Sequence, residues 1–253
     1  MQITLAAFLR NTPQGEEAQS IVQKCVHCGF CTATCPTYQL LGDELDGPRG
    51  RIYLMKQVLE GQPAGEATRQ HLDRCLTCRN CESTCPSGVT YGRLVEIGRK
   101  IVDDQLNAKG TSRPLGERAV RWALREGLTR PALFGSALRL GQAVRPILPQ
   151  VLRNKVPAKP QHAGGRPSAT HARKMLLLEG CVQPAMSPNI NAATARVFDK
   201  LGVQLISADR AGCCGAIRYH MNDHAGGLGN MRANIDAWWP YIEAGAEAIV
   251  MTA

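Results

Sequence analysis

Apolar residues recur at helical spacing in the first 106 residues of the chain. Three stretches show this pattern: residues 16–24, 51–60 and 91–106. Apolar side chains three and four positions apart share one face of a helix, so each stretch is predicted to be an amphipathic helix, the second ending at Gly61. No stretch here has the signals of a strand. The first part of the chain is therefore predicted to be α-helical.

Two more helices are predicted after the helix-breaking residues 107–114. They cover Leu115–Leu128 and Leu133–Val144. Residues 157–172 are rich in Pro, Gly, Ser and His, a composition that is typical of a linker. We therefore place a domain boundary in this segment.

After Lys174 short apolar runs alternate with helical patterns. Met175–Leu178, Val203–Ser207 and Ala248–Thr252 are predicted to be strands. Strands that alternate with helices pair in parallel, so this order predicts an α/β layer. Because the sequence stops on a strand, we expect the chain to be truncated at its C-terminus.

Two helices are predicted between these strands. Ser187 is expected to cap the first helix, which has Pro188 at its first position and is stopped by Gly202. The second helix lies within Asn222–Trp238, and Pro240 is expected to interrupt it.

Eight of the eleven cysteines form two copies of one pattern, fifty residues apart. Each copy reads C-x2-C-x2-C-x3-C-P, the spacing of bacterial two-cluster ferredoxins, and so predicts two [4Fe-4S] clusters. Since the runs lie among predicted helices, we expect an α-helical ferredoxin domain. The first run is Cys25, Cys28, Cys31 and Cys35 before Pro36, and the second is Cys75, Cys78, Cys81 and Cys85 before Pro86.

The fourth cysteine of each run is expected to bind the cluster of the other run. Three cysteines of one short loop can reach three corners of a cubane, and in two-cluster ferredoxins the fourth ligand comes from the other run. The predicted ligands of cluster one are Cys25, Cys28, Cys31 and Cys85, and those of cluster two are Cys75, Cys78, Cys81 and Cys35.

Zinc and disulfides are the alternatives for these cysteines. A four-cysteine zinc site uses two C-x2-C pairs, which leaves the third cysteine and the trailing C-x3-C-P without a role. Disulfides need an oxidising compartment, and residues 1–8 do not have the pattern of a signal peptide. No apolar run approaches the length of a membrane span. We therefore expect a cytoplasmic protein, either soluble or peripheral on the inner face of the cell membrane.

The net charge of +9 is concentrated in one segment. Residues 110–175 hold 13 Lys and Arg against two acids, and Arg118, Arg121 and Arg125 share one helix face. No aromatic-interleaved platform accompanies these charges, so we do not expect nucleic-acid binding. We expect a docking face for an acidic partner subunit or an anionic membrane surface, with a solvated linker face as the alternative.

The remaining cysteines form a candidate third metal site. Cys181 follows the first predicted strand, and Cys213 and Cys214 follow the second, before Gly215. Ligands bind at the carboxyl ends of strands in open α/β sheets. Three thiols are too few to close a cubane, and buried reduced cysteines or a vicinal disulfide are the alternatives.

Charged residues beside the cysteine runs are candidates to tune the clusters. Arg49, Arg51 and Arg79 are expected to raise a reduction potential or to pair with Asp43, Glu44 or Asp46. His27 lies between two predicted ligands and is either a tuning residue or a loop side chain. No general acid–base pair, nucleophile triad or Gly-rich nucleotide loop is recognised, so substrate chemistry is expected on a partner.

These residues resemble the iron–sulfur subunit of bacterial glycolate oxidase. The resemblance covers most of the chain and is weakest at residues 1–15 and 140–172. It rests on the cysteine runs together with Thr32–Ile52, Leu178–Pro184, Asn189–Val197, Ala211–Ala216 and Asn234–Pro240.

The resemblance implies an electron-transfer subunit of a three-part enzyme. A partner subunit carrying FAD oxidises glycolate to glyoxylate, and this subunit passes the electrons towards quinone or the respiratory chain. The cysteines at 181, 213 and 214 match the family's CCG domain, which continues with a further cysteine and a second CCG repeat. A glycerol-3-phosphate or lactate type of dehydrogenase, or a zinc-binding assembly module, are the alternatives.

Three parts of the chain follow from these patterns. Residues 1–110 are expected to form the two-cluster ferredoxin domain, residues 111–172 a basic helical connector and linker, and residues 173–253 a partial CCG domain.

Overall fold

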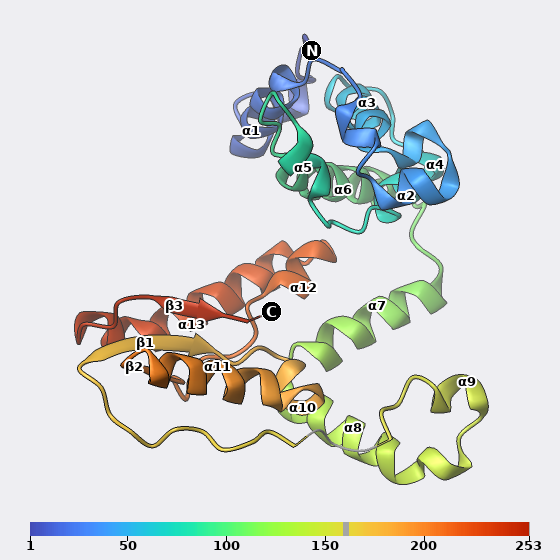
Figure 1. The fold of residues 1–253 in the computed structure, drawn as a ribbon. Coiled ribbons are helices and arrows are strands. Elements are labelled where there is room, and N and C mark those ends of the chain that lie inside the picture. The colour runs from blue at the N-terminus through green and yellow to red at the C-terminus, as the bar shows by residue number, and fades with distance from the viewer. Residues whose placement is uncertain (159–161, 253) are drawn as a thin grey trace. The chain divides into compact units, whose positions relative to one another are not determined.

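The computed structural model describes residues 1–158 and 162–252. It divides into two compact units, Met1–Arg113 and Pro114–Ala253. The described residues of the first unit form helices and turns, whereas the second unit contains a small sheet (Figure 1).

The first unit has six α-helices among its described residues. The helices predicted around residues 16–24, 51–60 and 91–106 are confirmed. The three others were not predicted, because eight residues or fewer are too short for a clear period. The helices are α1 (Pro13–Lys24), α2 (Pro36–Leu41), α3 (Pro48–Leu59), α4 (Glu66–Asp73), α5 (Asn80–Thr84) and α6 (Tyr91–Ala108).

Helix α6 lies at the centre of this unit. It contacts α1, α3, α4 and α5, and its Leu94 and Val95 are fully buried. Gly98 allows α3 to pack closely against it, since a Cβ there would lie 2.4 Å from the sulfur of Met55. The core therefore packs together the helices that precede and follow the two cysteine runs.

The second unit is built on three parallel strands in the order β2-β1-β3. The predicted strands and their parallel pairing are confirmed, with β1 (Arg173–Leu178) between β2 (Val203–Ile206) and β3 (Ile249–Met251). The helices described in this unit are α7 (Leu115–Leu128), α8 (Pro131–Val144), α9 (Gln150–Arg153), α10 (Gln183–Met186), α11 (Pro188–Lys200), α12 (Ala216–His220) and α13 (His224–Glu243).

Helices cover the central strand of this sheet. Leu176 and Leu178 of β1 pack with Trp238 of α13. Leu177, which points the other way, is also buried. Helix α11 packs against β2, and it runs along the sheet on the side away from α13 (Figure 1).

Two predictions about helix ends are corrected. Helix α13 is not interrupted at Pro240 but continues to Glu243. A proline removes one hydrogen-bond donor, and here only three helical residues follow it, while Ala237 and Trp238 are buried just before it. Ser187 precedes α11 as predicted, but its side chain makes no capping hydrogen bond.

The basic helices α7, α8 and α9 bury no residue completely. Helix α7 is tied to α12 because Glu126 pairs with Arg218 at 2.9 Å, and α8 packs against α10. These helices therefore belong to the second compact unit, and the domain limits at residues 110 and 172 remain a prediction. Their exposed apolar side chains include Leu115, Val120, Trp122, Leu133, Leu140 and Val151.

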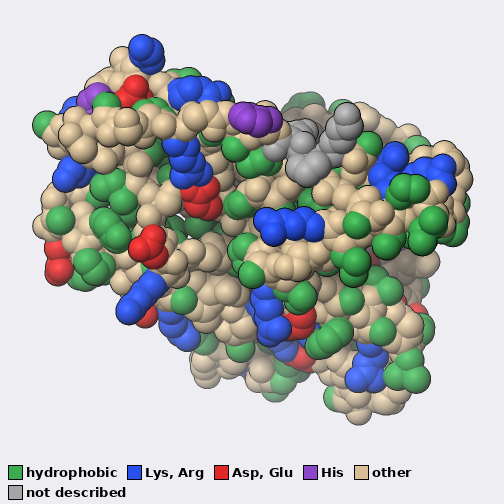
Figure 2. Space-filling view, turned by 90° about the horizontal axis from the view of Figure 1, so that it is seen from below, with side chains coloured by type: hydrophobic (Ala, Val, Ile, Leu, Met, Phe, Trp, Pro, Cys, Tyr) green, Lys and Arg blue, Asp and Glu red, His purple; other side chains and the backbone are tan. Residues whose placement is uncertain are grey.

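Basic side chains are scattered among apolar and neutral ones on the face of the molecule drawn in Figure 2. They do not gather there into one continuous patch. Of the described helices, none is long and apolar enough to cross a membrane. The cellular location remains a prediction.

Gly50 is predicted to be essential for the start of α3. A Cβ at this position would lie 2.1 Å from the carbonyl oxygen of Glu44 and 2.9 Å from Cα of Leu45, both backbone atoms. We expect Gly50→Ala to lower the free energy of unfolding by about 1–3 kcal/mol, as measured by urea denaturation. Gly65→Ala is the control, because nothing lies within 4 Å of its added Cβ. Equal effects of the two substitutions would contradict this packing argument.

Candidate metal centres

The two cysteine runs have the same backbone conformation. The residue before the second cysteine has a positive φ in both, 59° at His27 and 55° at Thr77. The residue after that cysteine does too, 87° at Gly29 and 61° at Arg79. Left-handed backbone is uncommon outside glycine, so its appearance at matched places shows that the repeat in sequence is also a repeat in structure.

Each loop forms part of a cavity that the other loop completes. Cys85 of the second run lines the first cavity, and Cys35 of the first run lines the second cavity. Cys81 lines both. The structure thus brings each predicted set of four thiols to one cavity: Cys25, Cys28, Cys31 and Cys85 at the first, and Cys35, Cys75, Cys78 and Cys81 at the second.

The thiols differ in their exposure to solvent. Cys25, Cys35 and Cys81 are buried, whereas Cys28 and Cys78, at matched positions of the runs, are exposed. Burial and the neighbouring thiols raise the pKa of Cys31 to about 11 and that of Cys81 to about 12. Both are therefore protonated near neutral pH, and a metal that binds them as thiolates must release their protons.

The third cysteine group also comes together. The thiols of Cys181 and Cys214 lie close enough to that of Cys213 to shift one another's pKa. The interaction with Cys213 lowers the pKa of Cys181 to about 7 and raises that of Cys214 well above its ordinary value. The predicted meeting of these loops beyond β1 and β2 is thus found.

Two parts of the chain match known domain families. Residues 21–89 match the 4Fe-4S dicluster domain, and residues 175–253 match the cysteine-rich domain. The chain joins a 4Fe-4S dicluster domain to a cysteine-rich domain. The predicted fold class is confirmed.

The chain is also similar to two bacterial proteins. It is 58% identical over 253 residues to the glycolate oxidase iron-sulfur subunit of Escherichia coli (strain K12), covering all of this chain and 61% of that protein. It is 31% identical over 242 residues to the probable glycolate oxidase iron-sulfur subunit of Bacillus subtilis (strain 168), covering 85% of this chain and 53% of that protein. The chain therefore spans between half and two thirds of these relatives. No solved structure shows significant similarity to the chain.

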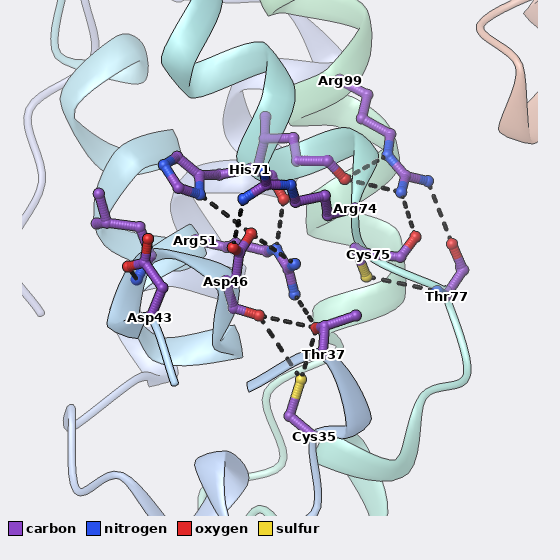
Figure 3. A network of polar contacts seen from close by, with 12 residues as sticks. Cys35, Thr37, Asp43, Asp46, Arg51, His71, Arg74, Cys75, Thr77 and Arg99 are labelled. Carbon is purple, nitrogen blue, oxygen red and sulfur yellow. Dashed lines mark hydrogen bonds and ion pairs between the residues drawn. The ribbon is translucent and has the colours of Figure 1, made fainter. Parts of the chain in front are cut away.

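Arg99 of α6 holds the second cysteine loop of the dicluster domain (Figure 3). It donates to the carbonyl oxygens of Leu72, at 2.8 Å, and Cys75, at 2.6 Å, and to Oγ1 of Thr77 at 3.2 Å. The N–H of Thr77 in turn points at the Cys75 sulfur, 3.4 Å away. The role of Arg99 was not predicted from the sequence. The only indication in the sequence is that Arg99 is a charged residue among the apolar residues of α6.

A buried carboxylate neutralises the cations behind the second cavity. Asp46 and Arg51 are almost completely buried, and Asp46 also binds Arg74 Nη1 at 2.8 Å and His71 Nδ1 at 3.0 Å (Figure 3). Burial alone would raise the pKa of Asp46, but the hydrogen bonds from His71 and Arg74 outweigh it and keep the pKa below its usual value. The carboxylate is therefore ionised at neutral pH.

Thr37 connects this buried charge to a predicted ligand. Its hydroxyl donates to the carbonyl oxygen of Asp46 at 2.8 Å and accepts from Arg51 Nη1 at 3.1 Å. The sulfur of Cys35 lies 3.2 Å from the same hydroxyl oxygen. Either the Cys35 thiol or the Thr37 hydroxyl can be the donor in this contact. The hydroxyl of Thr37 thus contacts both the guanidinium of Arg51 and the sulfur of Cys35.

The three arginines predicted to tune the clusters all line the cavities and are all paired. Arg49 lines the first cavity and pairs with Glu44 at 2.6 Å, and Arg51 lines the second cavity and pairs with Asp46 at 3.4 Å. Both pairs agree with the prediction that these arginines pair with nearby acids. Arg79, also at the second cavity, pairs at 2.8 Å with Glu82, three residues later on the same turn, instead of with the predicted acids. Pairing does not remove these arginines from the cavity walls. Their role in raising a reduction potential remains a prediction.

His27 is exposed and lies edge-on to Tyr53, with 6.4 Å between ring centroids. It also lines the first cavity. A tuning role for His27 remains a prediction.

Two buried asparagines position the loops of the cysteine-rich domain. Asn234 donates to the carbonyl oxygen of Cys213 at 3.0 Å and accepts from the N–H of Gly212 at 2.8 Å. Asn191 donates to the carbonyl oxygen of Glu179 at 2.9 Å, two residues before Cys181. Neither role was predicted. Each side-chain amide forms hydrogen bonds with backbone groups of a loop, where these groups have no partner in a strand or helix.

Gly215 is required directly after the paired cysteines. Its φ is +88°, and a Cβ there would lie 2.5 Å from the carbonyl oxygen of Gly227 in α13. The glycine therefore lets the cysteine loop turn and approach the helix closely.

Asp46 is predicted to be the main electrostatic support of the dicluster domain. Asp46→Asn leaves Arg51 buried without its counter-charge, so we expect a loss of about 3–5 kcal/mol in the free energy of unfolding at neutral pH, measured by urea denaturation. The native pKa is depressed, so the carboxylate stabilises the fold above its unfolded pKa of about 3.9, and this contribution is lost as the pH falls through the native value. The difference between wild type and variant should shrink accordingly in acid.

The control for this substitution is Asp104→Asn. Asp104 pairs with Lys100 at the surface, where an ion pair contributes no more than about 1 kcal/mol. A loss for Asp46→Asn as small as that of the control would refute the role assigned to the buried carboxylate.

Proposed function

We propose that this chain is an electron-transfer subunit that holds two [4Fe-4S] clusters in its dicluster domain. The observation that carries the proposal is the pair of cavities, each lined by three thiols of one run and the fourth thiol of the other, with Cys81 of the second set also reaching the first cavity. This is the ligand exchange expected for two-cluster ferredoxins. When bound, such clusters accept and release one electron at a time.

The protein around the cavities suits this task. Apolar side chains of Ile52 and Val89 line the first cavity, and such a wall limits the access of water and so influences the potential. Cys28 and Cys78 reach the surface at matched places. They offer one exposed edge at each cavity for the entry and exit of electrons.

We further propose that the electrons come from glycolate. The relatives in E. coli and B. subtilis are named glycolate oxidase iron-sulfur subunits, the second as probable, and the identity of 58% favours glycolate over the related dehydrogenases. A partner subunit with FAD would oxidise glycolate to glyoxylate, and this chain would relay the electrons towards quinone or the respiratory chain. The exposed apolar side chains along α7 to α9 suit a subunit interface.

The cysteine-rich domain is proposed to hold a third metal centre. Cys181, Cys213 and Cys214 are in mutual contact through Cys213. They supply three thiolates, and a cubane needs one more ligand from outside this set.

Metal analysis tests the main proposal. We expect protein purified without oxygen to contain about eight iron and eight sulfide ions for the dicluster domain, as two four-iron clusters require, and to give the EPR signals of reduced [4Fe-4S] clusters after dithionite treatment. Stoichiometric zinc without sulfide would instead establish the assembly-module alternative.

Paired substitutions test the exchange of the fourth ligand. We expect Cys35→Ser to impair the cluster bound by Cys75, Cys78 and Cys81, and Cys85→Ser to impair the cluster bound by Cys25, Cys28 and Cys31, because each fourth thiol lines the cavity of the other run. EPR spectra and iron content of the two variants should therefore show complementary losses. If each variant lost the cluster of its own run, the exchange would be wrong.

A further inference from the structure

Tyr91 forms part of the wall that the two cavities share. The cavities have three lining residues in common, Pro48, Cys81 and Tyr91. Pro48 has no group that can donate a hydrogen bond, and Cys81 is a proposed ligand. Tyr91 is thus the shared lining residue that can donate to whatever fills either cavity.

The hydroxyl of Tyr91 is buried without a hydrogen-bond partner among the described residues. The side chain is 4% exposed, and an unmade hydrogen bond at a buried polar group costs about 1–3 kcal/mol. The ordinary pKa of a tyrosine phenol is about 10, so the phenol is a proton donor at neutral pH. It lies beside Cys75, a proposed ligand, in the wall of the second cavity.

The backbone around Tyr91 is held in place. The N–H of Tyr91 donates to the carbonyl oxygen of Val89 at 2.9 Å, and the N–H of Gly92 donates to Glu82 Oε1 at 2.6 Å. Glu82 itself lies in α5, between the ligands Cys81 and Cys85. The start of α6 is thus fixed to the second cysteine run, which keeps the phenol at the cavity wall.

We infer that Tyr91 donates a hydrogen bond to sulfur of the cluster held by Cys75, Cys78, Cys81 and Cys35, and thereby raises its reduction potential. The inference rests on the proposed function, since it needs clusters in the cavities. Thiolate and sulfide sulfurs are acceptors, and hydrogen bonds to them are among the factors that set cluster potentials. A reduced cluster carries more negative charge, so a donor stabilises the reduced state more than the oxidised one.

Tyr91→Phe removes the hydroxyl and keeps the ring. In an EPR-monitored redox titration of the whole chain, we expect the second cluster to become harder to reduce, with the ratio of oxidised to reduced cluster about tenfold higher at a fixed potential. For a one-electron couple this corresponds to a negative shift of about 59 mV. The cluster held by Cys25, Cys28, Cys31 and Cys85 should shift less. Tyr241→Phe, the same change in the other unit, should leave both potentials unchanged.

A second substitution acts in the opposite direction. Replacing Tyr91 with 3-fluorotyrosine keeps the shape of the side chain and makes the hydroxyl a stronger donor, so the potential of the second cluster should become more positive. Should the Phe variant fail to assemble clusters, the fluorotyrosine variant decides alone. An unmoved potential in a variant that carries both clusters overturns the inference about Tyr91. Wild-type protein without iron and sulfide would overturn the proposed function instead.

Discussion

The dicluster domain depends on one geometric constraint: each cavity needs thiols from two segments fifty residues apart. Neither cysteine run lines a cavity with four thiols of its own. The helices around the runs therefore have to hold both loops against each other. Helix α6 contacts α1, which leads into the first run, and α4, which leads into the second. The packing of the hydrophobic core of this unit thus brings the proposed ligands together.

Burying so many charged and polar groups near the cavities requires compensation. Arg51 and Arg99 are both buried, which is costly unless each N–H finds an acceptor. The structure meets this cost in two ways. Arg51 has the carboxylate of Asp46 and the hydroxyl of Thr37, whereas Arg99 has carbonyl oxygens of the second cysteine loop. In both cases the polar groups that satisfy a buried cation also fix the backbone next to a proposed ligand.

The sequence was sufficient for features that repeat or that have a period. The spacing of the cysteines predicted which thiols meet, and the periodic apolar residues predicted the long helices and the three strands. The sequence was insufficient where a single polar residue forms hydrogen bonds with residues far away along the chain. Thr37, Arg99, Asn191 and Asn234 have no motif, and their partners are mostly backbone groups of loops remote in sequence. Pro240 is the opposite case. The rule that proline interrupts a helix predicted a break here, but α13 continues to Glu243 with Trp238 packed in the core.

The two cysteine runs are alike in backbone and unlike in charge, and this difference bears on the electron transfer that we propose. Arg51 and Arg79 line the second cavity, and Arg99 contacts the loop that begins at Cys75. At the first cavity the lining arginine is Arg49, which is paired with Glu44. Equal ligand sets would give equal potentials in equal surroundings, but potentials also depend on net charge, hydrogen bonds and exposure. The direction in which electrons move through such a repeat is therefore decided by the residues around the thiols and not by the thiols themselves.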